Sequence, residues 1–251
     1  MKFEINPQYK HLENFVLSLP ERFDKEGVCI YDGRNKIRVY EVAGLKINVK
    51  SYKVPIFINR IAYTFFRKSK AFRAYSYAFE LQKRKIETPA PIAYLETRKS
   101  GLIHRSYFVS LQFEADGNLR EFLDEDTTNE GKEALMDAFA EFTAELHEKG
   151  VLHIDYSPGN ILYKRMGDQF LFSLIDINRM EFGSISIEKG CHNFRRICGN
   201  DEFFTRVATL YARKRGFDEA ECIRLFLQYK YEERKRRDRK KAFKQKYLGK
   251  K

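Results

Sequence analysis

The sequence lacks a long apolar run, paired cysteines and tryptophan. No apolar run approaches the ~18 residues that a membrane-spanning helix requires, so any membrane contact is expected to be peripheral. The four cysteines form no CxxC pair, and no secretory leader is recognisable. This pattern favours a reduced, cytoplasmic chain without a structural zinc site. The absence of tryptophan excludes nothing by itself.

Positive charge is abundant and unevenly distributed. The formal net charge is +12, and the segment 230–251 holds 12 Lys and Arg against 3 Asp and Glu, which accounts for nine of those charges. Such a tail is either a solvated helical extension or a surface attracted to anionic lipid. Nucleic acid is the lower-ranked partner, because the only aromatic residues after Glu232 are Phe243 and Tyr247.

A dense group of polar residues lies between and beside two apolar strands. Asp155 follows His153 by two residues, Asn160 follows Asp155 by five, and a second apolar strand at 170–175 ends at Asp176. This order is typical of the catalytic loop and metal-binding segment of protein-kinase-like enzymes. His153 has the offset of a residue that orients the loop by hydrogen bonds.

Phosphoryl transfer explains why these residue types stand at these offsets. Asp155 is expected to orient the acceptor hydroxyl and to take its proton, while Asn160 and Asp176 hold Mg²⁺ against the phosphates of ATP. The alternative is that Asp155 and Asn160 serve only as turn and cap residues between a helix and a hairpin. Three polar residues in the expected settings favour the phosphotransferase.

The first part of the chain has the alternation of β-strands. We predict strands at 28–31, 36–40 and 45–50. The turn between the first two would lie over the nucleotide phosphates. It carries Gly33 in place of a G-x-G-x-x-G loop, and Arg34 and the backbone N–H groups near Gly33 can contact phosphate.

The third strand supplies a lysine for the nucleotide. Lys46, Asn48 and Lys50 share one face by period-two alternation. Lys50 is predicted to bind the α- and β-phosphates, because Ile-Asn-Val-Lys corresponds best to a Val-Ala-Ile-Lys strand end. Lys46 and Lys53 are the competing candidates, and a lysine on a solvated strand face is the remaining alternative.

Residues 54–79 are rich in aromatics and bases and contain no acidic residue. Apolar residues recur there at helical spacing, which favours an amphipathic helix pair packed into the lobe. The other interpretation is an interfacial surface that touches acyl chains and anionic headgroups. Glu80 is the nearest candidate partner for Lys50, although Ser76 occupies the position where active kinases carry that Glu.

The order of these elements predicts an α+β, bilobal protein-kinase-like fold. A small β-rich N-lobe, 1–115, would combine an antiparallel sheet with a helix and bind the nucleotide. A mainly helical C-lobe, 116–229, would carry the catalytic loop and metal site. The basic C-terminal tail, 230–251, completes the chain.

Several motifs resemble those of the lipopolysaccharide kinase family. They are His-Ile-Asp-Tyr-Ser-Pro-Gly-Asn-Ile-Leu at 153–162, Leu-Ile-Asp-Ile-Asn-Arg-Met at 174–180, Asp-Gly-Arg-Asn at 32–35, Ile-Asn-Val-Lys at 47–50, Phe-Phe-Arg-Lys-Ser-Lys at 65–70 and Thr-Pro-Ala-Pro-Ile-Ala at 88–93. The resemblance covers roughly residues 28–200. It implies ATP-dependent phosphorylation of a heptose or 3-deoxy-manno-octulosonic acid (Kdo) hydroxyl on the lipopolysaccharide core or a related glycolipid, at the cytoplasmic face of the inner membrane.

The resemblance also implies the family roles for Lys50, Asp155, Asn160 and Asp176. Two alternatives stay open at this stage. A RIO-like or aminoglycoside-type kinase acting on protein or a small molecule shares the catalytic motifs, and Ser157, where protein Ser/Thr kinases carry Lys, argues against an ordinary protein kinase. A nucleotide-binding pseudokinase scaffold is the second alternative.

Overall fold

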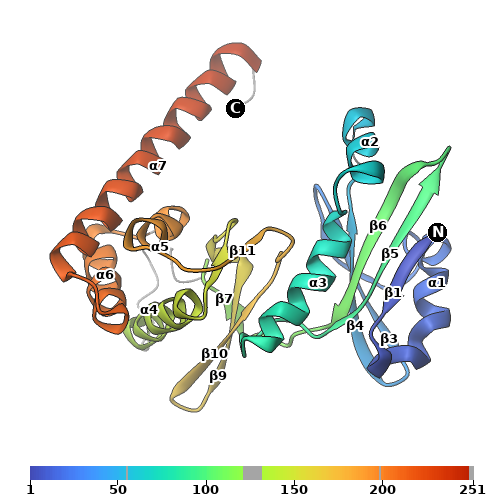
Figure 1. Cartoon of the computed structure of the whole chain (residues 1–251), viewed down its shortest axis with the longest axis horizontal. Coiled ribbons are helices and arrows are strands. Elements are labelled where there is room, and N and C mark those ends of the chain that lie inside the picture. Colours follow the sequence, from blue (N-terminus) through green and yellow to red (C-terminus); the bar gives the residue numbers. More distant parts are fainter. Residues whose placement is uncertain (55, 121–131, 198, 249–251) are drawn as a thin grey trace. The chain divides into compact units, whose positions relative to one another are not determined.

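The structure is a computed structural model that describes residues 1–54, 56–120, 132–197 and 199–248. The chain divides into two compact units (Figure 1). The first contains residues 1–114 and 173–179, and the second contains residues 115–172 and 180–251. The short segment 173–179, which includes Asp176, therefore groups with the amino-terminal sheet.

The first unit is built on a six-stranded antiparallel sheet with the order β1-β5-β6-β4-β3-β2. Its strands are β1 (Lys2–Ile5), β2 (Val28–Asp32), β3 (Lys36–Val42), β4 (Leu45–Tyr52), β5 (Pro91–Lys99) and β6 (Leu102–Leu111). The three predicted strands correspond to β2, β3 and β4. The β5–β6 turn has positive φ at Ser100 and Gly101, the backbone region that glycine tolerates best.

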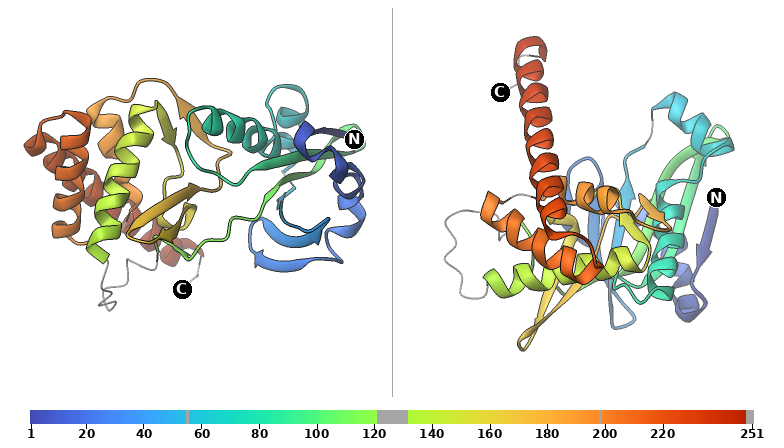
Figure 2. Two further views of the ribbon diagram at one scale, coloured as in Figure 1. Left: turned by 90° about the horizontal axis from the view of Figure 1, so that it is seen from below. Right: turned by 60° about the vertical axis from the view of Figure 1, so that its left-hand side comes forward.

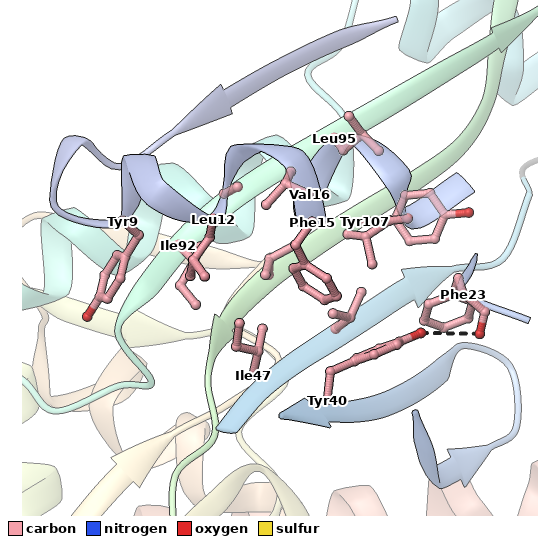
Figure 3. Close-up of a cluster of buried hydrophobic side chains, with 14 residues drawn as sticks. Tyr9, Leu12, Phe15, Val16, Phe23, Tyr40, Ile47, Ile92, Leu95 and Tyr107 are labelled. Atoms are coloured by element: carbon pink, nitrogen blue, oxygen red, sulfur yellow. Dashed lines mark hydrogen bonds between the residues drawn. The ribbon is translucent and has the colours of Figure 1, made fainter. Parts of the chain in front are cut away.

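One face of this sheet is covered by η1 (Pro7–Leu12) and α1 (Glu13–Arg22), as Figure 3 shows. Ile47 and Val49 of β4 are fully buried in this cluster with Phe15 and Tyr107. Because side chains alternate along a strand, Lys50 and Tyr52 lie on the opposite face. That face is covered by α3 (Lys70–Lys83), whose Tyr75 packs with Tyr52.

The second unit is mainly helical. Its helices are α4 (Lys132–Glu148), α5 (Ile187–Asn193), η3 (Phe194–Arg196), α6 (Asp201–Arg215) and α7 (Glu219–Leu248), and its short strands are β7 (Gly117–Asn118), β8 (Val151–His153), β9 (Ile161–Met166), β10 (Gln169–Leu174) and β11 (Met180–Phe182). Buried rings of Phe139, Tyr156, Phe194 and Phe226 form its core. The predicted β9–β10 hairpin is present, with Gly167 at positive φ in its turn.

The basic tail continues α7 as one helix through Leu248 (Figure 2). No helix among the described residues has the length and apolar character needed to cross a bilayer.

The α+β prediction is confirmed by this architecture: a β-rich amino-terminal sheet and a helical carboxy-terminal part.

Candidate active site

The catalytic loop of the second unit runs from β8 to β9. It leaves β8 after the buried His153, and Pro158 opens the short η2 helix (Pro158–Asn160). The Asn160 side chain donates from Nδ2 to the backbone oxygen of Asp155 at 2.9 Å. This bond fixes the loop through the amide nitrogen of Asn160. The amide oxygen, which is the atom that a hard cation prefers, takes no part in this bond.

Arg196 holds the Asp155 carboxylate. Its Nη1 donates to Asp155 Oδ1 at 2.9 Å, and both side chains are only partly exposed. A charge-assisted bond of this kind fixes the orientation of the carboxylate. Sequence reasoning missed Arg196, because it lies 41 residues beyond Asp155 and no motif spacing connects them.

A buried polar network supports the start of this loop. His147 of α4 contacts the Tyr211 hydroxyl through Nδ1 at 2.9 Å and Asn193 Oδ1 through Nε2 at 3.2 Å. Asn193 in turn donates from Nδ2 to the His153 backbone oxygen at 3.0 Å. Because Asn193 Oδ1 can only accept, His147 Nε2 carries the proton and Nδ1 accepts from Tyr211. Burial lowers the pKa of His147 to about 3, so the imidazole is neutral.

The first unit brings Lys50 and Asp176 together, although 126 residues separate them. Lys50 Nζ donates to Asp176 Oδ1 at 2.5 Å, and the Asn178 amide donates to the same oxygen at 2.6 Å. Asp176 has φ +55°, a left-handed conformation that costs energy for a residue other than glycine. Strained backbone of this type is common at functional sites.

Two bonds to the segment between α3 and β5 hold the Asp176 segment in place. Leu174 N donates to Glu87 O at 3.1 Å, and Thr88 Oγ1 donates to Leu174 O at 2.7 Å. Of the competing lysines, Lys46 bonds the exposed Glu114, whereas Lys53 lines a cavity described below. Only Lys50 of the three makes an ion pair with Asp176.

The predicted pairing of Lys50 with Glu80 is wrong. Lys50 bonds Asp176, and the Glu80 carboxylate accepts from Arg84 Nε at 2.8 Å. Arg84 lies one helical turn after Glu80, so it reaches the carboxylate along the same face of α3. In this structure Glu80 is therefore paired with Arg84 and not with Lys50.

The β2–β3 turn carries Gly33 and Arg34. Gly33 N donates to Asn35 O at 3.1 Å, which closes the turn, and Arg34 lines a cavity of about 260 Å³ together with Lys53 and Lys70. Burial lowers the pKa of Lys70, and the neighbouring cations Arg34, Arg73 and Lys50 act in the same direction while Asp176 opposes them. Sequence reasoning gave Lys70 no role in the site, although it is the last residue of the Phe-Phe-Arg-Lys-Ser-Lys motif at 65–70.

Each predicted metal ligand has an oxygen donor of the kind that Mg²⁺ prefers. Asp176 of the first unit offers carboxylate oxygens, and Asn160 of the second unit offers an amide oxygen. No group of three or more His, Cys, Asp or Glu within the described ranges could hold a metal by itself.

The catalytic-loop motif and this architecture define a phosphotransferase of the protein-kinase-like fold. Residues 32–221 match the sequence model of the "Lipopolysaccharide kinase (Kdo/WaaP) family". Because the match spans more than half of the chain, the protein belongs to this family, whose members are kinases that phosphorylate sugar hydroxyls.

A solved structure described as "WaaP in complex with acyl carrier protein" is similar to this chain. It has a TM-score of 0.64 and 18% sequence identity, over 94% of this chain and 99% of that chain. At that identity the likeness shows a shared fold. In all, 1526 solved chains match, so the fold alone does not identify the acceptor. No curated protein sequence matches the chain.

Proposed function

We propose that the protein transfers the γ-phosphoryl group of ATP to a Kdo or heptose hydroxyl of the lipopolysaccharide core or of a related glycolipid. The observation that carries this proposal is the Lys50–Asp176 ion pair, which joins residues 126 positions apart inside the region that matches the family. Both residues stand at the positions where kinase motifs carry the phosphate-binding lysine and the metal-binding aspartate.

The proposed reaction assigns a role to each of the predicted site residues. Asp155, oriented by Arg196, accepts the proton of the sugar hydroxyl as its oxygen forms a bond to the γ-phosphorus. The bond from the γ-phosphorus to the bridging oxygen breaks, and ADP leaves. Lys50 binds the α- and β-phosphates, and Gly33 and Arg34 contact phosphate from the β2–β3 turn.

Magnesium is the proposed metal, held by Asn160 and Asp176, and it would neutralise charge on the β- and γ-phosphates. The ion pair with Lys50 positions the Asp176 carboxylate for this role.

The proposed location is the cytoplasmic face of the inner membrane, where a lipid-linked acceptor is accessible. Support comes from the basic surface of α7, which would be attracted to anionic lipid. Nucleic acid is ranked below this partner, because the tail offers few aromatic side chains for stacking.

A nucleotide-binding scaffold without transfer activity is the second candidate. The observation that favours it is the position of Glu80, which bonds Arg84 in place of the strand lysine. Active kinases normally hold that lysine with a helix glutamate. In this chain Asp176 takes over the contact with Lys50, so the missing glutamate does not leave the lysine unpaired.

Transfer of label from γ-labelled ATP with Mg²⁺ tests these candidates. The acceptors are a core glycolipid that ends in Kdo, one that also carries heptose, and a generic protein. We expect label on a glycolipid, and Asp155→Asn should lower the rate by roughly 10³-fold. Asp168→Asn, in the exposed β9–β10 turn, is the matched control and should keep full activity.

The acceptor pattern decides between the candidates. Label on both glycolipids would indicate a Kdo hydroxyl, whereas label only on the heptose-containing one would indicate heptose. Label on protein alone would instead support a RIO-like kinase. Nucleotide binding with no transfer to any acceptor would favour the scaffold.

A further inference from the structure

The helix α2 (Phe57–Phe65) presents its apolar residues to solvent. At about 100° per residue, Phe57, Ile61, Phe65 and Ile58 fall within one arc of about 100°. Ile58 is 73% exposed and Phe66, just after the helix, is 82% exposed, and no residue of α2 is buried. We call this surface the apolar ridge, which consists of Ile56, Phe57, Ile58, Ile61, Phe65 and Phe66.

Polar bonds from Arg60 and Thr64, which flank the apolar arc on its Phe57 side, attach α2 to the sheet. Arg60 donates from Nε to Ile103 O at 2.9 Å and from Nη2 to Lys99 O at 3.1 Å. Ile103 N donates to Thr64 Oγ1 at 2.9 Å. Arg60 and Thr64 therefore anchor the helix to the β5–β6 hairpin, beside β6 (Figure 1). In an ordinary surface helix the apolar face packs inward and the charged face meets water, so α2 is reversed.

Basic residues surround the apolar ridge. Arg67 and Lys68 follow it directly, and no acidic residue occurs between 54 and 79. Lys53 and Lys70 line the cavity next to α2, together with Asn59 of the helix. The pocket beside Phe65 and Phe66 is lined by Arg67 and Lys68 and by one acidic residue, Glu96.

We propose that the apolar ridge of α2 inserts into the interfacial layer of a bilayer that contains anionic lipid, with Lys53, Arg67 and Lys68 facing the headgroups. Peripheral attachment of this kind needs an apolar face together with a basic surround, and α2 supplies both. A helix of nine residues is too short to span a bilayer and would lie in the plane of the interface. The inference concerns membrane binding and holds whether or not the proposed acceptor is correct.

A second copy of the chain is a poorer occupant of this surface. A symmetric contact through the ridge would bring together two copies of a surface that carries Arg67 and Lys68, and the 54–79 segment has no acidic residue to pair with them. The tail is a different kind of surface. Within 232–246 of α7 the exposed large apolar residue is Phe243, so this segment can attract anionic lipid but has little apolar surface to insert.

The absence of tryptophan gives a direct test. Phe66→Trp and Phe243→Trp each place one fluorophore in the full-length chain, on the ridge and on the tail respectively. Both are mixed with vesicles of phosphatidylcholine, with and without phosphatidylglycerol, and with lipids brominated along the acyl chain. For Phe66→Trp we expect a blue shift and quenching by the bromines, while Phe243→Trp should show clearly less quenching.

Binding constants from vesicle sedimentation give the second readout. The variant Phe57→Ser/Ile58→Ser/Phe66→Ser should bind anionic vesicles at least tenfold more weakly, with an unchanged melting temperature because these side chains are exposed. Met166→Ser, which changes an exposed apolar residue of β9, is the control and should bind like the parent. Arg67→Glu/Lys68→Glu should lose the preference for phosphatidylglycerol.

Three results would overturn the proposal. They are unquenched Phe66→Trp in a vesicle-bound protein, unchanged vesicle binding by the triple serine variant, and a Phe66→Trp blue shift that depends on protein concentration without lipid. The last result would assign the ridge to contact between copies. None of these measurements uses ATP or an acceptor, so they are independent of the transfer assay.

Discussion

Protonation of His147 should couple the stability of the second unit to pH. The side chain is 1% exposed and bonds Tyr211 and Asn193, so it has no room for a hydrating water shell when charged. Its pKa is lowered to about 3 by burial. In the unfolded chain a histidine has a pKa of about 6.5. Between those values the unfolded chain binds a proton that the native protein does not, so stability falls as the pH is lowered through this window.

The size of the effect follows from linkage. Each pH unit well below ~6.5 costs about 1.4 kcal/mol, so the free energy of unfolding should drop by about 2 kcal/mol between pH 7.5 and pH 5 from this residue alone. His147→Gln removes the titration. At pH 7.5 it should cost about 1–3 kcal/mol, because the flexible glutamine amide does not hold its acceptor and donor atoms where the imidazole ring holds them for Tyr211 and Asn193. At pH 5 that difference should shrink by about 2 kcal/mol.

Urea unfolding followed by circular dichroism at the two pH values measures these free energies. Tyr211→Phe is the control, since it deletes one bond to His147 but keeps the titrating group. It should lower stability by about 1 kcal/mol and retain the pH dependence of the parent. If the stability gap between the parent and His147→Gln is the same at both pH values, burial of a neutral histidine is not what shapes the acid response.

Three further outcomes follow from the site. Lys50→Met and Asp176→Asn should each lower the rate of single-turnover phosphoryl transfer by roughly 10²-fold or more. The melting temperature should stay within a few degrees of the parent's, because the ion pair is partly exposed. Full activity in either variant would show that the substituted residue is not part of the site. Arg196→Lys should lower kcat by about tenfold with little change in KM, because an ammonium does not hold a carboxylate as the guanidinium does; an equal loss in binding would show a different role. Glu80→Gln should change kcat less than about twofold, since its partner is Arg84 and not the nucleotide lysine, and a large loss would restore the rejected pairing.

Local patterns predicted most of the elements that build the site. Alternation fixed which face of β4 carries Lys50, and the buried Ile47 and Val49 show that the opposite face enters the core. The helix-loop-strand order around Asp155 was likewise predicted from the sequence. Contacts between residues far apart in the sequence could not be predicted from local patterns. The approach of Lys50 to Asp176 was implied only by family resemblance, and the Arg196 contact with Asp155 had no sequence signal.

The wrong assignment of Glu80 has a simple physical reason. Glu80 is the acidic residue nearest to the expected position on α3, one turn beyond Ser76. Arg84, however, lies at i+4 from Glu80 and competes for the carboxylate at almost no loop-closure cost. A local charge pair on one helix therefore prevailed over a pair between a helix and a strand.

The two helices of the 54–79 segment show why periodicity alone could not decide the role of its aromatic residues. In α3 the apolar stripe packs as predicted, with Tyr75 against Tyr52 and Tyr94. In α2 a stripe of the same spacing faces water. Periodicity shows which residues share one side of a helix. Whether that side faces the core or solvent depends on the contacts that each side of the helix can make. Arg60 donates to two backbone carbonyl oxygens of the β5–β6 hairpin, and with these bonds formed the apolar residues of α2 face solvent.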